Sequence, residues 1–334
     1  MKENPLISVI MSVYNEQEYI EDAVRSILDQ TESDFELIII DDCSTDDTVK
    51  IIEGINDERI ILVRNEENCG LTKNLNKALA MTRGEFIARM DGDDISMPGR
   101  FRVQTDHLRA HPDIMLISCN TATFGEHRLV SDIIGTPEEL KCTMLLRPVL
   151  AHPGFMFRRE LYEKHGFTYD ERFRSAQDYD FAARVTRQFN IAVTPEVLLQ
   201  YRAHKGQVSQ TPNMKQFGFA DEVRTRLLGE LGLTIDFDVY HKWVLEADAS
   251  KEEFIKCIRI LKMILESNTN TYDLAILKKT LWYQYFKWVL RSNGKKNIFS
   301  ICSVFPGRYC ALIKTFIRLA ASKHKRKQHL TVLP

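Results

Sequence analysis

Carboxylates gather at two places in this sequence, each after an apolar run. The first group is the pair at 41–42, which follows the run 37–40, and the second comprises Asp91, Asp93 and Asp94. Crowded carboxylates repel one another, which costs free energy unless a cation offsets the charge. Mg2+ and Mn2+ can do so because these hard cations prefer oxygen ligands. Turn formation and helix capping also place carboxylates at such positions. The sequence therefore indicates a cation site at the second group and leaves the first open between a functional role and capping.

Strands that alternate with helices are expected to position both groups. The β-rich runs lie near 6–13, 35–40, 60–63 and 85–90, and the helical patterns lie near 20–28, 46–55 and 71–82. This alternation is typical of right-handed βαβ crossovers in a mostly parallel sheet. Such a sheet binds ligands beyond the carboxyl ends of its strands, so both acidic groups are predicted at one edge.

The rest of the chain indicates a second half of the same sheet and then a helical extension. Between about 106 and 215, strands are expected near 114–119 and 197–202, and a helix near 178–190. Beyond 216 the β-rich runs stop, and helical patterns lie at 217–232, 250–266 and 272–291. The prediction is an α/β protein in three parts, which are 1–105, 106–215 and 216–334.

Composition excludes some classes of protein. With 334 residues and a net charge of -1, the chain lacks the basic surplus of a typical nucleic-acid binder, so no nucleic-acid partner is expected. The seven cysteines form no Cys-x-x-Cys pair and are expected as reduced thiols. An N-terminal signal pattern and a run of about 18 apolar residues are both absent, which predicts a cytoplasmic protein.

The C-terminal tail has two interpretations. Apolar residues near 298–321 precede a basic cluster at 323–327. An amphipathic segment with a cationic end suits an anionic membrane surface, which would place the protein at the inner face of the cell membrane. Ordinary packing of the apolar stripe and a solvated charged end explain the same pattern. Peripheral membrane contact is therefore left open.

Four ordered motifs lie in the N-terminal third. They are 8–16 (SVIMSVYNE), 35–46 (FELIIIDDCSTD) after Gln30-Thr31, 68–71 (NCGL) followed by Asn74 and Asn76, and 84–94 (GEFIARMDGDD). Together these motifs resemble glycosyltransferase family 2, and the resemblance covers about residues 5–210. It implies a GT-A fold, a Rossmann-like and mostly parallel sheet flanked by helices, with 1–105 as the nucleotide-sugar half and 106–215 as the acceptor half.

The resemblance implies a UDP-sugar site in the first half. Tyr14 and the Ser12 backbone would contact the nucleobase, and Asp42 would accept a base N–H. Asp91 would approach the ribose, and Asp93 would bind Mn2+ or Mg2+. The implied donor-binding residues are Ser12, Tyr14, Asn15, Asp42, Asn68, Gly70, Asn74, Asp91 and Arg202.

Part of this donor set has a plain structural explanation. Asn74 falls on a predicted helix beside its buried face, and Asn68 and Gly70 could form an ordinary turn before that helix. A helix N-terminus is also a good diphosphate site. Direct donor contact by this segment stays open.

Inverting transfer needs a carboxylate that takes the proton of the attacking hydroxyl on the side opposite the leaving diphosphate. By resemblance this base is Asp178, in the segment 175–181 (SAQDYDF), where Gln177 departs from the usual Glu. Negative charge at a helix start explains Asp178 or Asp180 without catalysis. The sequence therefore predicts Asp178 as the base and keeps a helix-start role as the alternative.

Two histidines fall in further segments that resemble the family. His152, in HPGFMFRR, resembles the part that faces the acceptor. His204, in YRAH, resembles a residue that binds metal or diphosphate in some members, and Arg202 beside it could neutralise phosphate. A lone histidine more often makes structural hydrogen bonds. The implied acceptor-binding residues are His152 and Gln177, and the implied metal ligands are Asp93 and His204.

The predicted function is inverting, Mn2+- or Mg2+-dependent transfer of a hexose or N-acetylhexosamine from a UDP-sugar to a saccharide acceptor. Acceptors linked to polyprenyl diphosphate, as in surface polysaccharide assembly, belong to this class. A processive membrane synthase is disfavoured because the Gln-x-x-Arg-Trp signature is absent. Two alternatives stay open, a catalytically inactive nucleotide-sugar scaffold and a Mg2+-binding receiver-like module. The module would span about 120 residues and would leave the segments of His152 and Asp178 unexplained.

Overall fold

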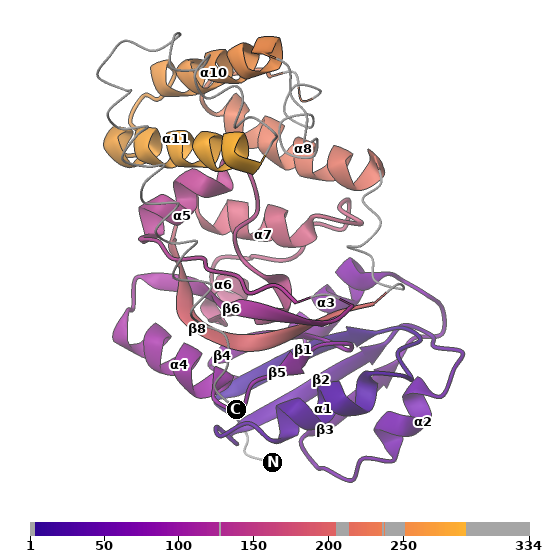
Figure 1. Ribbon diagram of the computed structural model, residues 1–334. Coiled ribbons are helices and arrows are strands. Elements are labelled where there is room, and N and C mark those ends of the chain that lie inside the picture. The colour runs from indigo at the N-terminus through magenta and orange to yellow at the C-terminus, as the bar shows by residue number, and fades with distance from the viewer. Residues whose placement is uncertain (1–3, 127, 205–213, 236, 238–250, 292–334) are drawn as a thin grey trace. The chain divides into compact units, whose positions relative to one another are not determined.

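The computed structural model describes residues 4–126, 128–204, 214–235, 237 and 251–291 (Figure 1). The chain divides into two compact units, one made of Met1–Thr234 with Asn268–Leu277 and the other of Ile235–Ser267 with Lys278–Pro334. The tail at 298–327, on which the membrane-contact prediction depends, lies outside the described residues.

One eight-stranded sheet forms the centre of the first unit, in the order β3-β2-β1-β4-β7-β6-β8-β5. The strands are β1 (Ile7–Val13), β2 (Phe35–Asp41), β3 (Ile60–Arg64), β4 (Phe86–Asp91), β5 (Ile95–Ser96), β6 (Ile114–Gly125), β7 (Met156–Arg158) and β8 (Asn190–Ala203). The pairs β1–β2, β1–β4, β2–β3 and β6–β8 are parallel. Strand β7 is antiparallel to β4 and β6, and β5 is antiparallel to β8.

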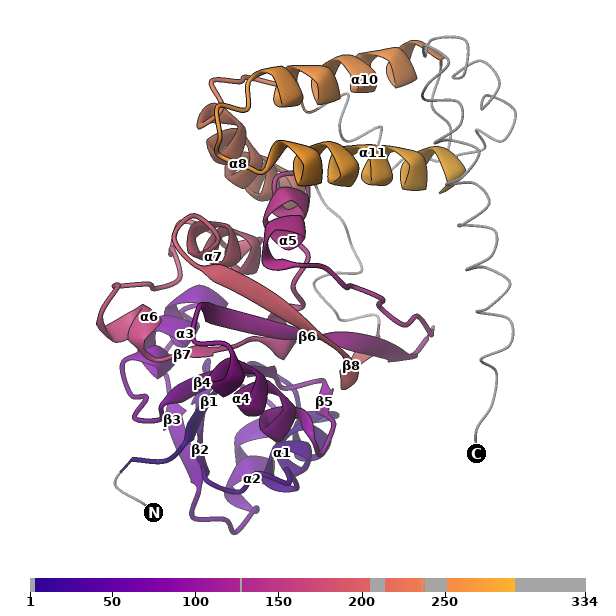
Figure 2. The same ribbon diagram turned by 90° about the vertical axis from the view of Figure 1, so that its left-hand side faces the viewer.

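Helices flank this sheet, as Figures 1 and 2 show. They are α1 (Ile20–Leu28), α2 (Thr48–Glu53), α3 (Leu71–Leu79), α4 (Arg100–Ala110), α5 (Pro137–Met144), the short 3-10 helix η1 (His152–Gly154), α6 (Glu160–Glu163) and α7 (Gln177–Val185). The central strands β1, β2 and β4 are buried almost throughout, which is typical of parallel strands covered on both faces. The predicted α/β class, a mostly parallel sheet flanked by helices, is confirmed.

The two faces of the central strands have different neighbours. Val9 and Met11 of β1 and Met90 of β4 belong to the apolar cluster that also contains buried residues of α1 and α4. Successive strand residues point to opposite faces, so the side chains between them turn away from this cluster. On that other side lies α3, whose Asn74 donates a hydrogen bond to Ser12 Oγ (3.1 Å). Ser12 is therefore positioned on the face that the candidate site uses.

Strands β6 and β8 are longer than the sequence indicates, and α7 is shorter. The helix predicted near 178–190 ends at Val185, and β8 begins at Asn190. Figure 2 shows β6 and β8 running side by side. Their register shifts where Asn120 lies opposite Val197, and the Asn120 amide donates to the carbonyl of Pro195 (3.2 Å). This bulge accommodates a proline inside a strand, which local periodicity does not reveal.

The remaining described helices are α8 (Met214–Gly229), α10 (Lys251–Glu266) and α11 (Leu274–Arg291). They agree with the predicted C-terminal helical extension. None of the helices in the described ranges is long and apolar enough to span a membrane.

Candidate functional site

The two acidic groups meet at one edge of the sheet. Strand β2 ends at Asp41 and β4 ends at Asp91, and both are parallel neighbours of β1. Ser12, next to the end of β1, pairs in register with Asp91 on one side and Ile40 on the other. The carboxyl ends of the three strands therefore lie together, which is where a sheet of this kind binds ligands.

Three carboxylates converge after β4. Ligand oxygens of Asp91, Asp93 and Asp94 all lie within 4.8 Å of one another. Asp94 is fully buried, and burial, followed by the charges of Asp91 and Asp93, raises its pKa well above the usual value. Its Oδ2 has no hydrogen-bond partner among the described residues. This donor set and the unpaired oxygen fit a hard divalent cation, which would stabilise the ionised carboxylates.

His204 joins this cluster from the end of the second half. Its Nε2 lies 3.0 Å from Asp93 Oδ2, and its ring packs on Tyr19 at a centroid distance of 4.7 Å. The structure thus brings together Asp93 and His204, which are 111 residues apart in sequence. An imidazole nitrogen beside carboxylate oxygens suits a mixed cation shell.

Glu16 is a fourth carboxyl at this edge, and it was not among the predicted site residues. A Cβ added to Gly92 would lie 3.5 Å from the Glu16 carboxyl carbon, so the two loops are in contact. Burial, and then the charges of Asp93 and Asp91, raise the pKa of Glu16 to about 8. The available signal was its position three residues after β1, because β1 ends at the same edge as β2 and β4.

Arg202 supports the main chain of the acidic loop. Its backbone N–H donates to Asp94 Oδ1 (2.8 Å), and its Nε donates to the Asp93 carbonyl (2.7 Å). The guanidinium lies over the rings of Tyr19 and Phe124, at 4.8 and 4.6 Å from their centroids. The structure therefore places Arg202 at the cluster with several of its donors already engaged.

Asp42 is buried and anchors the loop before α3. Its Oδ1 accepts from Asn65 Nδ2 (2.9 Å) and the Cys69 N–H (2.8 Å), and its Oδ2 accepts from the Gly70 N–H (2.9 Å). Burial alone would raise the pKa of Asp42, but hydrogen bonds from Cys69, Asn74, Asn65 and Gly70 outweigh it and lower the pKa. Gly70 has φ 88°, a conformation that favours glycine. Asp42 is thus an ionised group that organises this loop.

We expect Asp42→Asn to destabilise the fold by about 1–3 kcal/mol at pH 7, because an amide cannot accept all these hydrogen bonds. The folded pKa of Asp42 is lowered, so its ionised form stabilises the fold above the pKa of an unfolded Asp. That contribution is lost as the pH falls through the folded pKa. The free energy of unfolding of variant and wild type should be measured by urea unfolding at several pH values. The difference between the two should become smaller below about pH 4.

The matched control for this variant is Asp132→Asn, which changes an exposed carboxylate. It should leave the free energy of unfolding nearly unchanged at every pH. An Asp42→Asn penalty that stays constant from neutral to acidic pH would contradict the assigned role of the charge.

Other predicted donor residues link loops at the same edge. Asn74 is buried, and its Oδ1 accepts from Asn65 Nδ2 (2.7 Å) while its amide donates to Ser12. Asn15 has φ 54°, and its Oδ1 accepts from the Thr45 N–H (2.8 Å). Asn68 donates weakly to the Asp42 carbonyl (3.4 Å). Tyr14 is 47% exposed, so its ring is open to a ligand.

Asp178 lies in the first turn of α7, two residues after Ala176, which has φ 59°. Burial raises the pKa of Asp178, and the backbone N–H of Tyr179 and the charge of Arg89 lower it in part. The charge of Asp178 in turn raises the pKa of Asp91. The charge of Asp178 is therefore felt at Asp91.

Both predicted acceptor residues, His152 and Gln177, are buried. His152 Nε2 lies 3.0 Å from the Tyr169 hydroxyl, and burial and the charge of Arg89 lower the pKa of His152 well below the usual value. His152 is therefore a neutral imidazole at physiological pH. Gln177 is 8% exposed, and its Oε1 has no hydrogen-bond partner among the described residues.

Asp180, the alternative to Asp178, has a different environment. It is fully buried and pairs with Arg184 (2.8 Å) on its own helix and with Arg226 (2.7 Å) of α8. With both oxygens paired to cations, Asp180 fastens α7 to α8.

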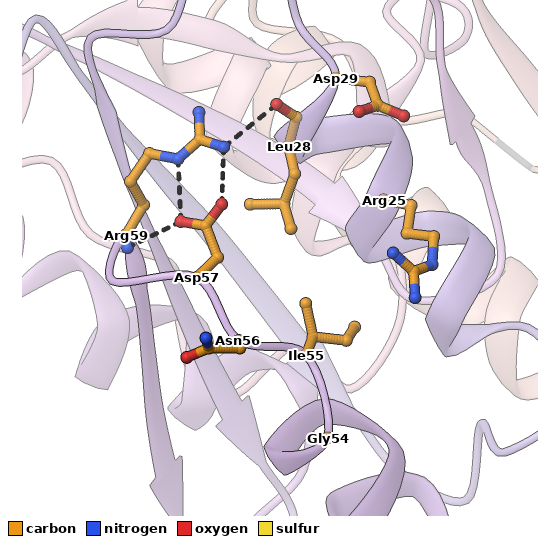
Figure 3. Close-up of a pocket in the computed structure, with 8 residues that line it drawn as sticks. All are labelled: Arg25, Leu28, Asp29, Gly54, Ile55, Asn56, Asp57 and Arg59. Atoms are coloured by element: carbon orange, nitrogen blue, oxygen red, sulfur yellow. Dashed lines mark hydrogen bonds and ion pairs between the residues drawn. The ribbon is translucent and has the colours of Figure 1, made fainter.

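Figure 3 shows a hollow of about 290 Å3 that lies away from this site. It is lined by Arg25, Leu28, Asp29, Gly54, Ile55, Asn56, Asp57 and Arg59. These residues come from the end of α1 and the loop before β3, at the amino-terminal edge of the sheet. Arg59 pairs with Asp57 (2.7 Å) and donates to the Leu28 carbonyl (3.2 Å). The hollow has no part in the candidate site.

Residues 8–166 match the model of glycosyl transferase family 2. The glycosyltransferase MJ1057 of Methanocaldococcus jannaschii is 33% identical over 210 residues, which are 60% of this chain and 71% of that protein. The Bacillus subtilis protein TuaG, named as a glycosyltransferase of teichuronic acid biosynthesis, is 49% identical over 136 residues, 40% of this chain and 50% of that protein.

Among solved structures, residues 1–349 of Staphylococcus aureus TarS, crystallised with UDP-GlcNAc, superpose with a TM-score of 0.57. The superposition covers 86% of this chain and 89% of that one, at 18% sequence identity. At this identity the likeness concerns the fold alone.

Proposed function

Because this chain belongs to glycosyltransferase family 2, and is therefore a glycosyltransferase, we propose that it moves a hexose or N-acetylhexosamine, with inversion, from a UDP-sugar to a saccharide acceptor. Two features support this proposal most: a carboxylate cluster suited to a cation, and a separate carboxylate suited to the role of general base. The carboxylate cluster with His204 gathers beyond β4, and the charge of Asp178, in the first turn of α7, raises the pKa of Asp91.

On the donor side, the proposed nucleotide site lies over the ends of β1, β2 and β4. The exposed ring of Tyr14 offers a stacking face to the base, beside the Ser12 backbone. Asp42 is ionised, and a carboxylate oxygen can accept a base N–H in addition to the loop hydrogen bonds that it already receives. Asp91 lies at the end of β4, next to Ser12 of β1, and would contact the ribose. The UDP-GlcNAc complex of TarS is consistent with this class of donor on this fold.

Asp93 and His204 are the proposed ligands of Mn2+ or Mg2+. When bound, such a cation would neutralise the charge that develops on the leaving diphosphate. Asp94 holds its loop in place through the backbone of Arg202, and Arg202 adds positive charge at the same end. These residues therefore orient the diphosphate and favour its departure.

On the acceptor side, Asp178 would act as the general base. The acceptor oxygen attacks the anomeric carbon as the bond to the diphosphate breaks, and the hydroxyl proton passes to the Asp178 carboxylate. Burial raises the pKa of Asp178, which makes it a better proton acceptor than an exposed Asp. Neutral His152 and Gln177, whose buried carbonyl oxygen is unpaired, would hydrogen-bond the acceptor sugar.

We further propose a role in surface polysaccharide assembly, for which TuaG, named for teichuronic acid biosynthesis, gives the support. The acceptor would then be linked to polyprenyl diphosphate at the inner face of the cell membrane. The basic cluster at 323–327 would supply the membrane contact, with the protein otherwise in the cytoplasm.

The decisive experiment is a screen of nucleotide sugars for release of free nucleotide. We expect the purified chain to release UDP from a UDP-hexose or UDP-N-acetylhexosamine with Mn2+ present and not after EDTA treatment. A matched series of GDP- and CMP-sugars serves as the control for base recognition. UDP binding by calorimetry with no turnover of any donor, with or without added saccharides, would favour the inactive scaffold instead.

A further inference from the structure

Arg89 is a buried cation in the middle of the candidate site. It is 2% exposed and lies on β4, two residues before Asp91 and one strand position from the core residues Ala88 and Met90. Because strand residues alternate, the Arg89 side chain points away from the apolar cluster and toward the same face as Asp91. Its backbone N–H donates to the Phe155 carbonyl (2.9 Å), which places it against the segment that contains His152.

The guanidinium of Arg89 forms a two-pronged pair with the carboxylate of Asp91. One terminal nitrogen bonds Oδ2 and the other pairs with Oδ1. The side chain of Arg89 is 3% exposed in this pair, and that of Asp91 is 28% exposed. A planar fork of this kind fixes the plane of the carboxylate as well as its position. Asp91 therefore has one orientation toward the donor side.

The same cation also acts on the acceptor side. The charge of Arg89 lowers the pKa of both Asp178 and His152. A packed route connects these groups, because His152 bonds the Tyr169 hydroxyl and the Tyr169 ring stacks on Phe181 of α7 at 4.8 Å. The Nε of Arg89 has no hydrogen-bond partner among the described residues. The direct side-chain contact of this guanidinium is the fork on Asp91.

We propose that Arg89 is a positioning residue for the donor: its fork holds the carboxylate of Asp91 in the one orientation that meets the nucleotide sugar. This inference rests on the proposed function. It assigns Arg89 no direct part in bond making, and it explains why a guanidinium is buried among carboxylates where an apolar residue would otherwise complete the strand.

Two substitutions separate the fork of Arg89 from its charge. Arg89→Met keeps the bulk of the side chain and removes both the charge and the fork, and Arg89→Lys keeps the charge and removes the fork. Both variants should bind UDP about tenfold more weakly by calorimetry, because Asp91 is no longer held.

The matched control is Arg158→Met, at the far end of the β4–β7 pair. Its guanidinium donates to the main-chain carbonyls of Ile114 and Leu108. This variant should lower Tm and leave UDP affinity unchanged. If the two Arg89 variants behave as this control does, Arg89 is merely structural and the inference is wrong. If Arg89→Met does not fold, Arg89→Lys alone tests the inference. An Arg89→Lys variant with wild-type UDP affinity would show that the fork does not position Asp91 for the donor.

The same measurements distinguish this inference from the proposed function. A wild-type chain that releases nucleotide, together with Arg89 variants of unchanged UDP affinity, would contradict the inference alone. A wild-type chain that neither binds UDP nor releases it from any donor would contradict the proposed function, and the inference with it.

Discussion

Asp178→Asn is expected to lower kcat for sugar transfer by about 10²–10⁴-fold, the usual contribution of a general base. The amide keeps the shape of the carboxylate but cannot take the proton of the acceptor hydroxyl. Since Asp178 belongs to the acceptor side, UDP affinity measured by calorimetry should remain within about twofold of wild type. The measurement is steady-state transfer with saturating donor and acceptor.

Asp180→Asn is the matched control for this prediction. It lies two residues away on α7, and its carboxylate pairs with Arg184 and Arg226. Loss of this buried pairing should reduce Tm, because it leaves buried cations without a partner. Transfer per folded molecule should fall far less than in Asp178→Asn. If the order of the two variants is reversed, Asp180 is the base and the assignment of Asp178 is wrong.

Asp93→Ala is expected to abolish metal-dependent binding of the donor. Asp93 meets His204 at 3.0 Å, and both are proposed as ligands of one cation, so removing the carboxylate removes charge and a ligand atom together. We expect the affinity for UDP in the presence of Mn2+ to fall by about 100-fold or more. Calorimetry with Mn2+ and with EDTA measures the effect, and the variant should give the same weak binding in both.

Asp113→Ala supplies the control, because Asp113 precedes β6, bonds Asn190 (2.8 Å) and lies outside the cluster. It removes the same charge and should preserve the Mn2+ dependence. An Asp93→Ala variant that still binds UDP more tightly with Mn2+ than with EDTA would refute the assignment of Asp93 as a ligand.

Much of the fold could be predicted from local pattern. The strands β1, β2, β3 and β4 and the helices between them lie close to the predicted ranges, because each is a short apolar or amphipathic run. Placing the groups after Ile40 and after Ala88 at one edge required only the rule for parallel strands. The limits of α7 and β8 were wrong, because the bulge around Pro195 depends on pairing with β6.

Less of the candidate site than of the fold could be predicted from local sequence pattern. Glu16 and Arg89 both lie inside motifs that were recognised, yet neither was predicted as a site residue. Their importance comes from neighbours that are distant in sequence: Glu16 meets Gly92, and Arg89 acts on both Asp91 and Asp178. A buried Arg in a strand has no periodic signature that separates a packing role from an electrostatic one.

By itself the sequence determined the α/β class, the edge of the sheet at which both acidic groups lie and the residue types available there, because strand polarity and side-chain alternation follow from local pattern. Only the tertiary structure decided that Asp93 meets His204, that Asp180 is tied to α8, and that a buried guanidinium pairs with Asp91. The physical reason is that pairing and burial depend on distance in space, and burial sets how strongly each charge is felt.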